Sequence, residues 1–353
     1  MSILAPVYHV LPLTAIERER VLPIDGNVLV KMNQKVNATD VIAEASWSRE
    51  HKLVDVARAL GISPAQADRL LRVKVGDEVS QGSELAVGSG FMPRSVQAPC
   101  DGQVVVTGGG QILIAAGDAS LELRAGLNGT VVQVIPNRGA VIRTVGALIQ
   151  GRWGNGRIET GMMVSPIETP DEALTASHMD INLRGSILLG GFIRDAETLR
   201  AAGEVSLRGL IVSSISPALL PIAMQMTFPI ISIEGFGQIR MNSAASKLLF
   251  SNVKREVTIN AEAFDRYTGK RPEIIIPLPV AQEPALPLEV DTLAPGQTVW
   301  IRRAPYAGAI GTLENLRSGL TALPDGLRAP VAEVRLENGE LVLVPLVNLE
   351  IVG

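Results

Sequence analysis

VKVGDEVSQGSELA, at residues 73–86, is the stretch that decides the fold. Short apolar runs alternate in it with Gly-Asp and Gln-Gly turn signals, a pattern that predicts short strands joined by tight turns. A second stretch, VLVKMNQKVNATDVIA at residues 28–43, has the same order of strand, turn, short strand, turn and apolar strand. The sequence therefore predicts an internal repeat of one β-module.

A third strand–turn–strand piece follows at residues 127–149. The whole region from residue 21 to residue 161 consists of short apolar runs separated by Gly, Asn and Asp, which is typical of many short strands. We expect this region to form one module.

Residues 73–106, with VKVGDEVSQG and then APCDGQVVV, resemble the biotinyl/lipoyl barrel-sandwich hybrid fold. The most similar variant is the barrel-sandwich module of the C subunit of the Rnf electron-transport complex, and the resemblance extends loosely over the first 160 residues. It implies a barrel-sandwich hybrid at 21–161. Carriers of this family place a lysine on a hairpin between the two quoted pieces, whereas GSGFMPRS at 88–95 has none. The cysteine clusters of the Rnf subunit are also absent, so neither prosthetic group is expected.

Residues 53–71, LVDVARALGISPAQADRLL, have helical spacing on both sides of Gly61, and Ser63-Pro64 is typical of a helix start. One interpretation is a DNA-reading helix-turn-helix, since six basic and three acidic residues between positions 49 and 74 give a local charge of +3. The interpretation we favour is a helical hairpin, inserted at 50–72, that covers the barrel.

Residues 180–277 alternate between strands and helices, which predicts a small, mainly parallel α/β domain. Strands are expected at 185–191, 207–214 and 228–237, and helices at 195–205, 217–226 and 243–251. Residues 210–233 lack charge over a length that could cross a bilayer. They contain three prolines, however, and these favour a strand, a short helix and a second strand.

Ligands of such sheets bind at the carboxyl ends of the strands, where this chain has small and polar residues. The candidate ligand-binding residues are Gly190, Gly191, Ser213, Ser214, Ser216, Glu234, Gly235 and Gly237. Glycine and serine also end strands in ordinary turns, which is the alternative. No histidine or cysteine lies beside them in sequence, so no catalytic residue is assigned.

Local composition suggests one further site and a linker. GRWGNGR at 151–157 predicts an anion-binding loop formed by Arg152, Gly154, Gly156 and Arg157, the alternative being a flexible turn between domains. Residues 278–292 predict an extended, proline-rich linker to the last module.

Residues 294–312, APGQTVWIRRAPYAGAIGT, resemble the KOW motif, the SH3-like barrel element of ribosomal proteins and NusG-type elongation factors. Gly296, Val299, Gly308 and Gly311 carry the resemblance, which covers residues 293–353. It implies binding of RNA or protein. Five basic and six acidic residues leave this module at −1, which favours a protein partner. The candidate contact residues are Arg302, Arg303 and Tyr306.

Composition narrows the function classes. A chain of 353 residues with 46% hydrophobic residues predicts a multidomain protein of mixed α and β structure. Its single cysteine, Cys100, excludes an internal disulfide and a cysteine-based metal site, and the three histidines are isolated. No metal site and no cofactor are therefore expected. The cysteine usage and the absence of a signal pattern in the first 20 residues predict a cytoplasmic protein.

The resulting hypothesis is a non-enzymatic scaffold or adaptor that binds partner proteins, or further copies of itself, through its β-modules. One alternative is a KOW factor associated with nucleic acid, although a net charge of −4 does not favour that partner. Another is a ligand-binding or enzymatic α/β crevice.

Overall fold

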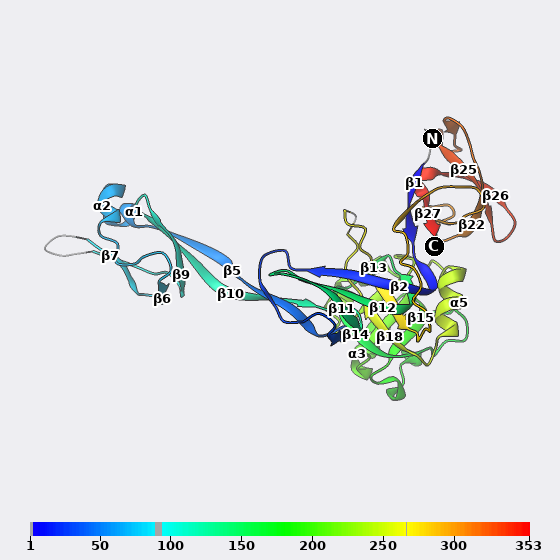
Figure 1. Cartoon of the computed structure of the whole chain (residues 1–353), viewed down its shortest axis with the longest axis horizontal. Helices are drawn as coiled ribbons and strands as arrows, with labels where there is room; N and C mark the ends of the chain where they lie inside the picture. Colours follow the sequence, from blue (N-terminus) through cyan, green and yellow to red (C-terminus); the bar gives the residue numbers. More distant parts are fainter. Residues whose placement is uncertain (1–2, 89–93, 266) are drawn as a thin grey trace.

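The computed structural model describes residues 3–88, 94–265 and 267–353, and strands dominate it. A body made of several packed elements lies at one end, and a small module lies at the end of a long two-stranded arm (Figure 1). The two ends of the chain lie together on a third unit at the far side of the body.

The structure contains two copies of one β-module. One copy lies in the body and carries the arm, and the other forms the tip. The strands of the body copy are β3 (Asn27–Val28), β4 (Lys35–Val36), the start of β5 (Val41–Asp55), β11 (Gly129–Ile135) and β12 (Gly139–Gln150). Those of the tip copy are β6 (Glu78–Val79), β7 (Glu84–Val87), β8 (Ser95–Gln97), β9 (Gly102–Gly108) and β10 (Gln111–Arg124).

Hydrogen bonds confirm the predicted repeat. In the body copy, Asn33 N donates to Val131 O over 2.8 Å, and in the tip copy Gly76 N donates to Val104 O over the same distance. Both donors have a positive φ, 66° and 100°. The short strand is paired in the same register in each copy, with Val36 opposite Gly129 and Val79 opposite Gly102. The two stretches therefore fold alike, 43 residues apart.

The cores of the two copies correspond as well. Each contains buried apolar residues at matching positions. The pairs are Val36 and Val79, Ile42 and Leu85, Ala125 and Ala98, Val131 and Val104, and Ile142 and Ile114. Each copy thus buries a core of its own, which allows the tip to fold at a distance from the body.

The arm is a long hairpin of the body copy, and the tip copy has a short hairpin at the corresponding place. Strands β5 and β10 pair antiparallel from Val41 opposite Arg124 to Asp55 opposite Gln111. At about 3.3 Å per residue, β5 spans about 45 Å. Its counterpart in the tip is the hairpin β7–β8, closed by Gly88 N, which donates to Arg94 O over 2.8 Å. One copy of the module is therefore carried on the hairpin of the other.

The predicted helical insert begins later than expected. Residues 50–55 continue β5, and the helices are α1 (Val56–Leu60) and α2 (Pro64–Asp68). Asp55 Oδ1 accepts from Arg58 N and starts α1, and Gly61, with φ 71°, ends it. Ala57 and Ala67 are buried in the tip core, so this short hairpin covers one side of the tip module.

The middle segment contains the predicted alternation. Strands β14 (Ile158–Val164), β15 (Ile187–Ile193), β16 (Gly209–Ile215) and β17 (Ile230–Ser232) are parallel neighbours. The helices are α3 (Ala196–Val205), α4 (Leu220–Gln225) and α5 (Ser243–Ser251). Short 3₁₀ segments of this part are η1 (Ala176–His178), η2 (Ile181–Leu183) and η3 (Pro217–Leu219), and a further one, η4 (Leu346–Asn348), lies in the C-terminal unit.

The sheet of this segment is not separate from the N-terminal module. Strand β14 also pairs antiparallel with β18 (Glu256–Asn260), and β18 leads through β19 (Glu273–Pro277) to β12. One sheet thus runs in the order β13-β17-β16-β15-β14-β18-β19-β12-β11-β4, where β13 is Trp153–Gly154. The boundary predicted between residues 161 and 180 is crossed by continuous hydrogen bonding.

The uncharged stretch at 210–233 forms β16, η3, α4 and β17, as the prolines predicted. Pro217 and Pro221 lie in the first turns of η3 and α4, where a missing N–H costs nothing. In the part of the chain that the structure describes, no helix has the length and apolar character needed to cross a membrane.

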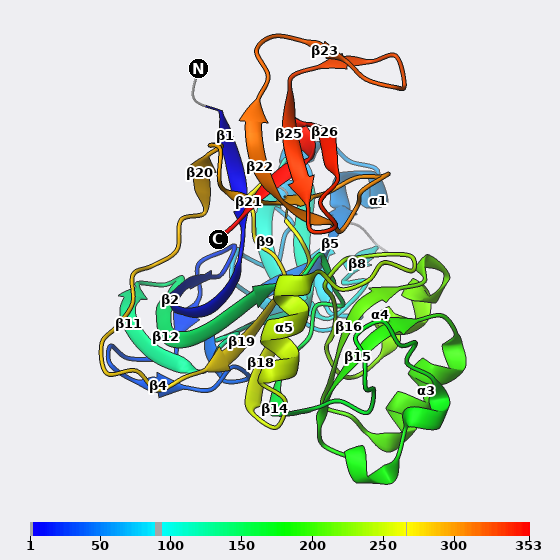
Figure 2. The same ribbon diagram turned by 90° about the vertical axis from the view of Figure 1, so that its right-hand side faces the viewer.

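The C-terminal unit is a sheet that includes the start of the chain (Figure 2). Its strands are β20 (Val290–Thr292), β1 (Leu4–Tyr8), β27 (Leu349–Val352), β21 (Thr298–Ile301), β22 (Ile310–Leu316), β25 (Val331–Leu336) and β26 (Leu341–Pro345), with a side hairpin of β23 (Thr321–Ala322) and β24 (Arg328–Ala329). Two expected boundaries are corrected here. Residues 4–8 belong to this unit because Ala5 and Val7 are buried in its core, and residues 290–292 of the expected linker form β20.

Candidate functional site

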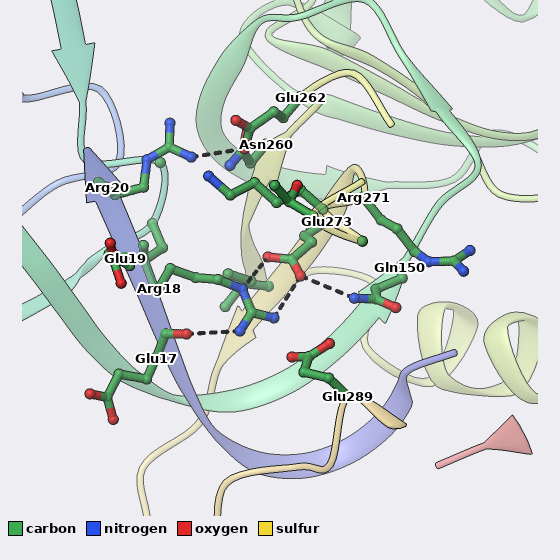
Figure 3. Close-up of a pocket in the computed structure, with 16 residues that line it drawn as sticks. Glu17, Arg18, Glu19, Arg20, Gln150, Asn260, Glu262, Arg271, Glu273 and Glu289 are labelled. Atoms are coloured by element: carbon green, nitrogen blue, oxygen red, sulfur yellow. Dashed lines mark hydrogen bonds and ion pairs between the residues drawn. The ribbon is translucent and has the colours of Figure 1, made fainter. Parts of the chain in front are cut away.

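A charged cleft of about 430 Å³ lies where the arm joins the body (Figure 3). It is lined from β2 (Val10–Val21), β12, the start of β19 and the segments that follow β10 and β18. Nine charged side chains line it: Glu17, Arg18, Glu19, Arg20, Glu262, Lys270, Arg271, Glu273 and Glu289. Both signs of charge therefore meet in one partly enclosed space.

Arg18 and Glu273 form a two-pronged ion pair in this cleft (Figure 3). Arg18 Nε donates to Glu273 Oε2 over 2.9 Å and Nη2 donates to Oε1 over 2.6 Å. Gln150 Nε2 donates to the same Oε1 over 3.3 Å. Burial alone would lower the pKa of Arg18, but the adjacent carboxylate outweighs it and raises that pKa. The pair holds β2 against β19.

Arg20 attaches the root of the arm. Its Nη1 donates to Glu262 Oε2 over 2.8 Å, and its Nε donates to the carbonyl of Arg124, the last residue of β10. Gly126, with φ 81°, turns the chain beside it, and a Cβ there would lie 3.0 Å from Asn260 Nδ2. The cleft is thus a set of charged contacts that fixes the arm to the body.

The candidate ligand crevice is filled by the chain itself. Gly190 and Gly191 lie within β15, not at its end. A Cβ on Gly190 would lie 2.9 Å from Leu174, and one on Gly191 would lie 1.9 Å from the carbonyl of Glu172. These glycines are needed because residues 172–174 pack directly on the strand.

The serines and glycines at the ends of β16 and β17 come together as predicted, but their polar groups bind the chain itself, apart from Ser213 Oγ, which has no hydrogen-bond partner among the described residues. Ser214 Oγ donates to Gly237 O and Ile239 O and accepts from Ile239 N. Gly235 N donates to Ser232 Oγ, and Ser216 N donates to Ile193 O. Ser213 is fully buried. These groups hold the loop at residues 233–242 on the sheet.

Glu234 is the charged member of this group, and it is 1% exposed. Its Oε1 accepts from Asn242 N over 3.0 Å and from Asn242 Nδ2 over 2.7 Å. Oε2 has no hydrogen-bond partner among the described residues. Burial raises the pKa of this carboxyl to about 7. It is therefore a buried acid that titrates near neutrality.

The residues of the predicted anion loop are built into the sheet. Trp153 and Gly154 form β13, paired with β17, and a Cβ on Gly154 would lie 2.3 Å from Ala261 O. The amide of Arg152 donates to Ser232 O, and that of Gly156 donates to Ala261 O. Arg157 O accepts from Ala261 N. The amides of Arg152 and Gly156 are thus occupied, and the segment is tied to the sheet through β13 rather than being a free turn.

Three separately predicted sites meet at the junction between the body and the C-terminal unit. The Arg152 guanidinium lies 3.9 Å above the Trp300 ring, and Arg152 Nη1 donates to the carbonyl of Arg302 over 3.5 Å. Glu234 lies on the same side, where Oε2 would be 3.4 Å from a Cβ on Gly308. Arg152, Glu234 and Arg302 were expected in three different sites, and the fold brings them together.

The remaining contacts of the junction come from residues that the sequence did not single out. Tyr8 stacks on Trp300 with ring centroids 4.9 Å apart, and its hydroxyl donates to Gln150 O. Glu350 Oε1 accepts from Arg271 Nη2 over 2.9 Å and from Arg302 Nε over 3.1 Å. Aromatic residues are only 3% of the chain, and two of them stack here. Their rarity was the one feature of the sequence that could have drawn attention to Tyr8 and Trp300.

The other candidate contact residues lie at the rim of this junction. Arg303 is exposed, and Tyr306 packs half-buried on the core of the C-terminal unit. Beside them is an open cleft of about 820 Å³, lined by residues 238–243 on one side and 307–310 on the other. Ser243 Oγ donates to Glu337 across it. The C-terminal unit is thus docked on the α/β segment through side chains of both.

The charged cleft was also missed, although ERER at 17–20 is a usable signal. Alternate residues of a strand share a face, so a strand over these residues places Arg18 and Arg20 on the same face. Their acidic partners lie more than 240 residues away in sequence and could not be identified.

Among residues 3–88, 94–265 and 267–353, no group of three or more His, Cys, Asp or Glu side chains is placed to hold a metal ion. The stretch without lysine at 88–95 lies mainly outside the described residues, which end at 88 and resume at 94. Comparison with known proteins finds no family model that matches the chain and no curated protein that matches it.

Proposed function

We propose that this chain is a non-enzymatic adaptor that holds its tip module away from the body so that a partner protein can bind there. The observation that carries the proposal is the arm (Figure 1). Between Ala45 and Glu50, β5 pairs with β10 and with no other strand described, so a two-stranded ribbon of about 15 Å separates the two cores.

Both ends of the arm are fixed, which supports a spacer with a defined direction. At the root, Ala43 and Ala45 of β5 pack on Leu22, and Arg20 binds the end of β10. At the other end, Ile112 and Ile114 of β10 lie in the tip core. A module held in this way presents its surface at a set distance, as an adaptor requires.

An armless variant tests the proposal. Ser46 lies opposite Ser120, so residues 47–119 can be replaced by Asn-Gly, which favours the tight turn of a two-residue hairpin loop. The intact chain and the armless variant would be compared by affinity capture with cross-linking from lysate of the cells that encode it. We expect a protein partner that the intact chain retains and the armless variant loses.

The control is the fold of the body. Thermal unfolding and circular dichroism of the armless variant should show a folded body, because the bridged strands keep their register. Identical partner sets for the two proteins, or an intact chain that stays alone, would contradict the proposal.

A further inference from the structure

The tip carries a pocket that belongs to neither the charged cleft nor the junction. It has a volume of about 430 Å³ and lies between the α1–α2 hairpin and the base of the β7–β8 hairpin. Its lining residues are Leu60, Ile62, Gln66, Arg69, Leu70, Gly88 and Arg94. The hydrogen bond from Gly88 N to Arg94 O fixes one wall.

The internal repeat shows that this pocket is an addition to the shared module. In the body copy, the chain passes from β2 to β3 through residues 22–26. In the tip copy, the corresponding connection from the end of β5 contains α1 and α2, and its residues 60–70 supply five of the seven lining residues. The body copy of the module folds without such a hairpin, whereas in the tip Ala57 and Ala67 of the hairpin pack on the core.

The chemistry of the pocket is an apolar floor with a cationic rim. Leu60, Ile62 and Leu70 are partly exposed, whereas Arg69 and Arg94 are exposed. Neither guanidinium group has an ion pair or a hydrogen bond to the rest of the described chain. Two exposed guanidinium groups beside uncovered apolar side chains are the usual composition of a protein contact.

Two acidic groups of the tip have partners other than these arginines. Asp68 accepts from Gly109 N and Gly110 N, with 2.7 Å to the latter. Glu84 pairs with Arg72 over 3.2 Å. The positive charge of Arg69 and Arg94 is therefore directed at solvent.

We infer that this pocket binds an acidic segment of a partner protein that also inserts an apolar side chain. The apolar side chain lies on Leu60, Ile62 and Leu70, and carboxylates bind the two arginines, which match their planar geometry. Nucleic acid fits less well, because phosphate binding depends on many cations and gains nothing from an apolar floor. The inference rests on the proposed adaptor function and names the class of partner.

Fluorescence anisotropy with the intact chain tests it. The probe is the fluorescein-labelled peptide SDLEELDS, compared with SNLQQLNS, which lacks the charges, and SDAEEADS, which lacks the leucines. We expect binding of the first peptide, weakened by salt, and about tenfold weaker binding of each of the others.

Variants of the chain locate the binding. Arg69→Glu and Arg94→Glu should each weaken binding of SDLEELDS by about tenfold or more, because attraction becomes repulsion. Arg58→Glu is the matched control, since Arg58 is an exposed arginine of the same helical hairpin outside the pocket. Its affinity should stay within about twofold of the parent. All three positions are exposed, so thermal midpoints should agree.

Three results would overturn the inference: no binding of SDLEELDS, an equal effect of all three substitutions, or preferential binding of a labelled oligouridine through Arg69 and Arg94. The adaptor function is judged separately. A partner that needs the arm but tolerates Arg69→Glu and Arg94→Glu would retain the adaptor and reject this pocket. Peptide binding without an arm-dependent partner would do the reverse.

Discussion

Glu234 and Glu273 are both buried carboxylates, but their charges are balanced to different degrees. Glu273 is held by both prongs of Arg18. Glu234 has one oxygen bonded to Asn242 and the other without a partner among the described residues. A paired charge tolerates burial, whereas an incompletely satisfied one becomes easier to protonate. The two sites therefore predict different responses to pH and to substitution.

Glu234→Gln should remove a pH dependence of stability. The folded pKa of about 7 lies above the ordinary value of 4.5, so the folded state binds the proton more tightly. This stabilisation is complete below about pH 4.5 and is lost as the pH rises through about 7. A shift of this size corresponds to about 3 kcal/mol in the free energy of unfolding. Urea denaturation of both proteins between pH 4.5 and 8 measures it, and parallel curves would refute the assignment.

Arg18→Met should destabilise the body by about 3 kcal/mol, because it leaves Glu273 buried without its partner. Adding Glu273→Gln to that variant should recover most of the loss, since the uncompensated charge is then gone. Arg143→Met is the control: Arg143 pairs with Glu17 at a more exposed position, and its loss should cost less than about 1 kcal/mol. Equal losses for the two single variants would show that the buried pair has no special weight.

At the scale of elements, the sequence predicted well the bounds of helices and strands that nearby residues determine. Helix α5 has the predicted bounds, 243–251, because Asn242 accepts from Ala245 N and caps it. Strands β15 and β16 lie within two residues of the prediction at either end. The pairing of strands that lie far apart in the sequence could not be predicted. Strand β1 finds its partners at residues 290–292 and 351–352, and nothing in its own residues indicates them.

The same limit applies to the candidate sites. Residues at the ends of β16 and β17 were placed correctly beside one another, because parallel strands end at one edge of a sheet. Whether a ligand or the chain fills that edge depends on the path of residues 233–242, which pattern alone does not give. Arg152 and Arg302 were singled out for charge, and their meeting at Trp300 follows from docking of two units.

The two copies of the β-module should respond separately to equivalent substitutions. Gly102 in the tip and Gly129 in the body face the same kind of obstacle, with a Cβ 2.2 Å from Ala115 O and 2.4 Å from Arg143 O. Gly102→Ala should cost about 1–3 kcal/mol through this crowding. Hydrogen exchange should rise in the tip, at 73–110, and not in the body, whereas Gly129→Ala should give the opposite pattern. Exchange spread over both regions would show one cooperative unit.

At the scale of the whole molecule, the start of the chain is part of its last unit. Strand β1 lies between β20 and β27, and Tyr8 then stacks on Trp300 at the junction. The body is thereby held to the C-terminal unit by covalent connections on both sides, through β2 and through residues 278–289. Docking of this unit is a property of the entire fold.

Removal of residues 1–8 should loosen the C-terminal unit and leave the tip intact. Ile351, which pairs with Val7, would lose its neighbour on the side of β1, and the core of the unit would lose Ala5 and Val7. We expect limited proteolysis, followed by mass spectrometry, to cleave faster within 290–353 and at an unchanged rate within 73–110. Protection of 290–353 equal to that of the parent would mean that β1 contributes little to the unit.

In this molecule one copy of the β-module is inserted in a hairpin of the other copy, so the same insertion could be repeated. The hairpin of β7 and β8 has the place in the tip copy that the arm has in the body copy. A third copy of the module joined to β7 and β8 would extend the molecule further from the body. The distance from the body to the outermost module can therefore change in evolution by adding or removing copies of the module.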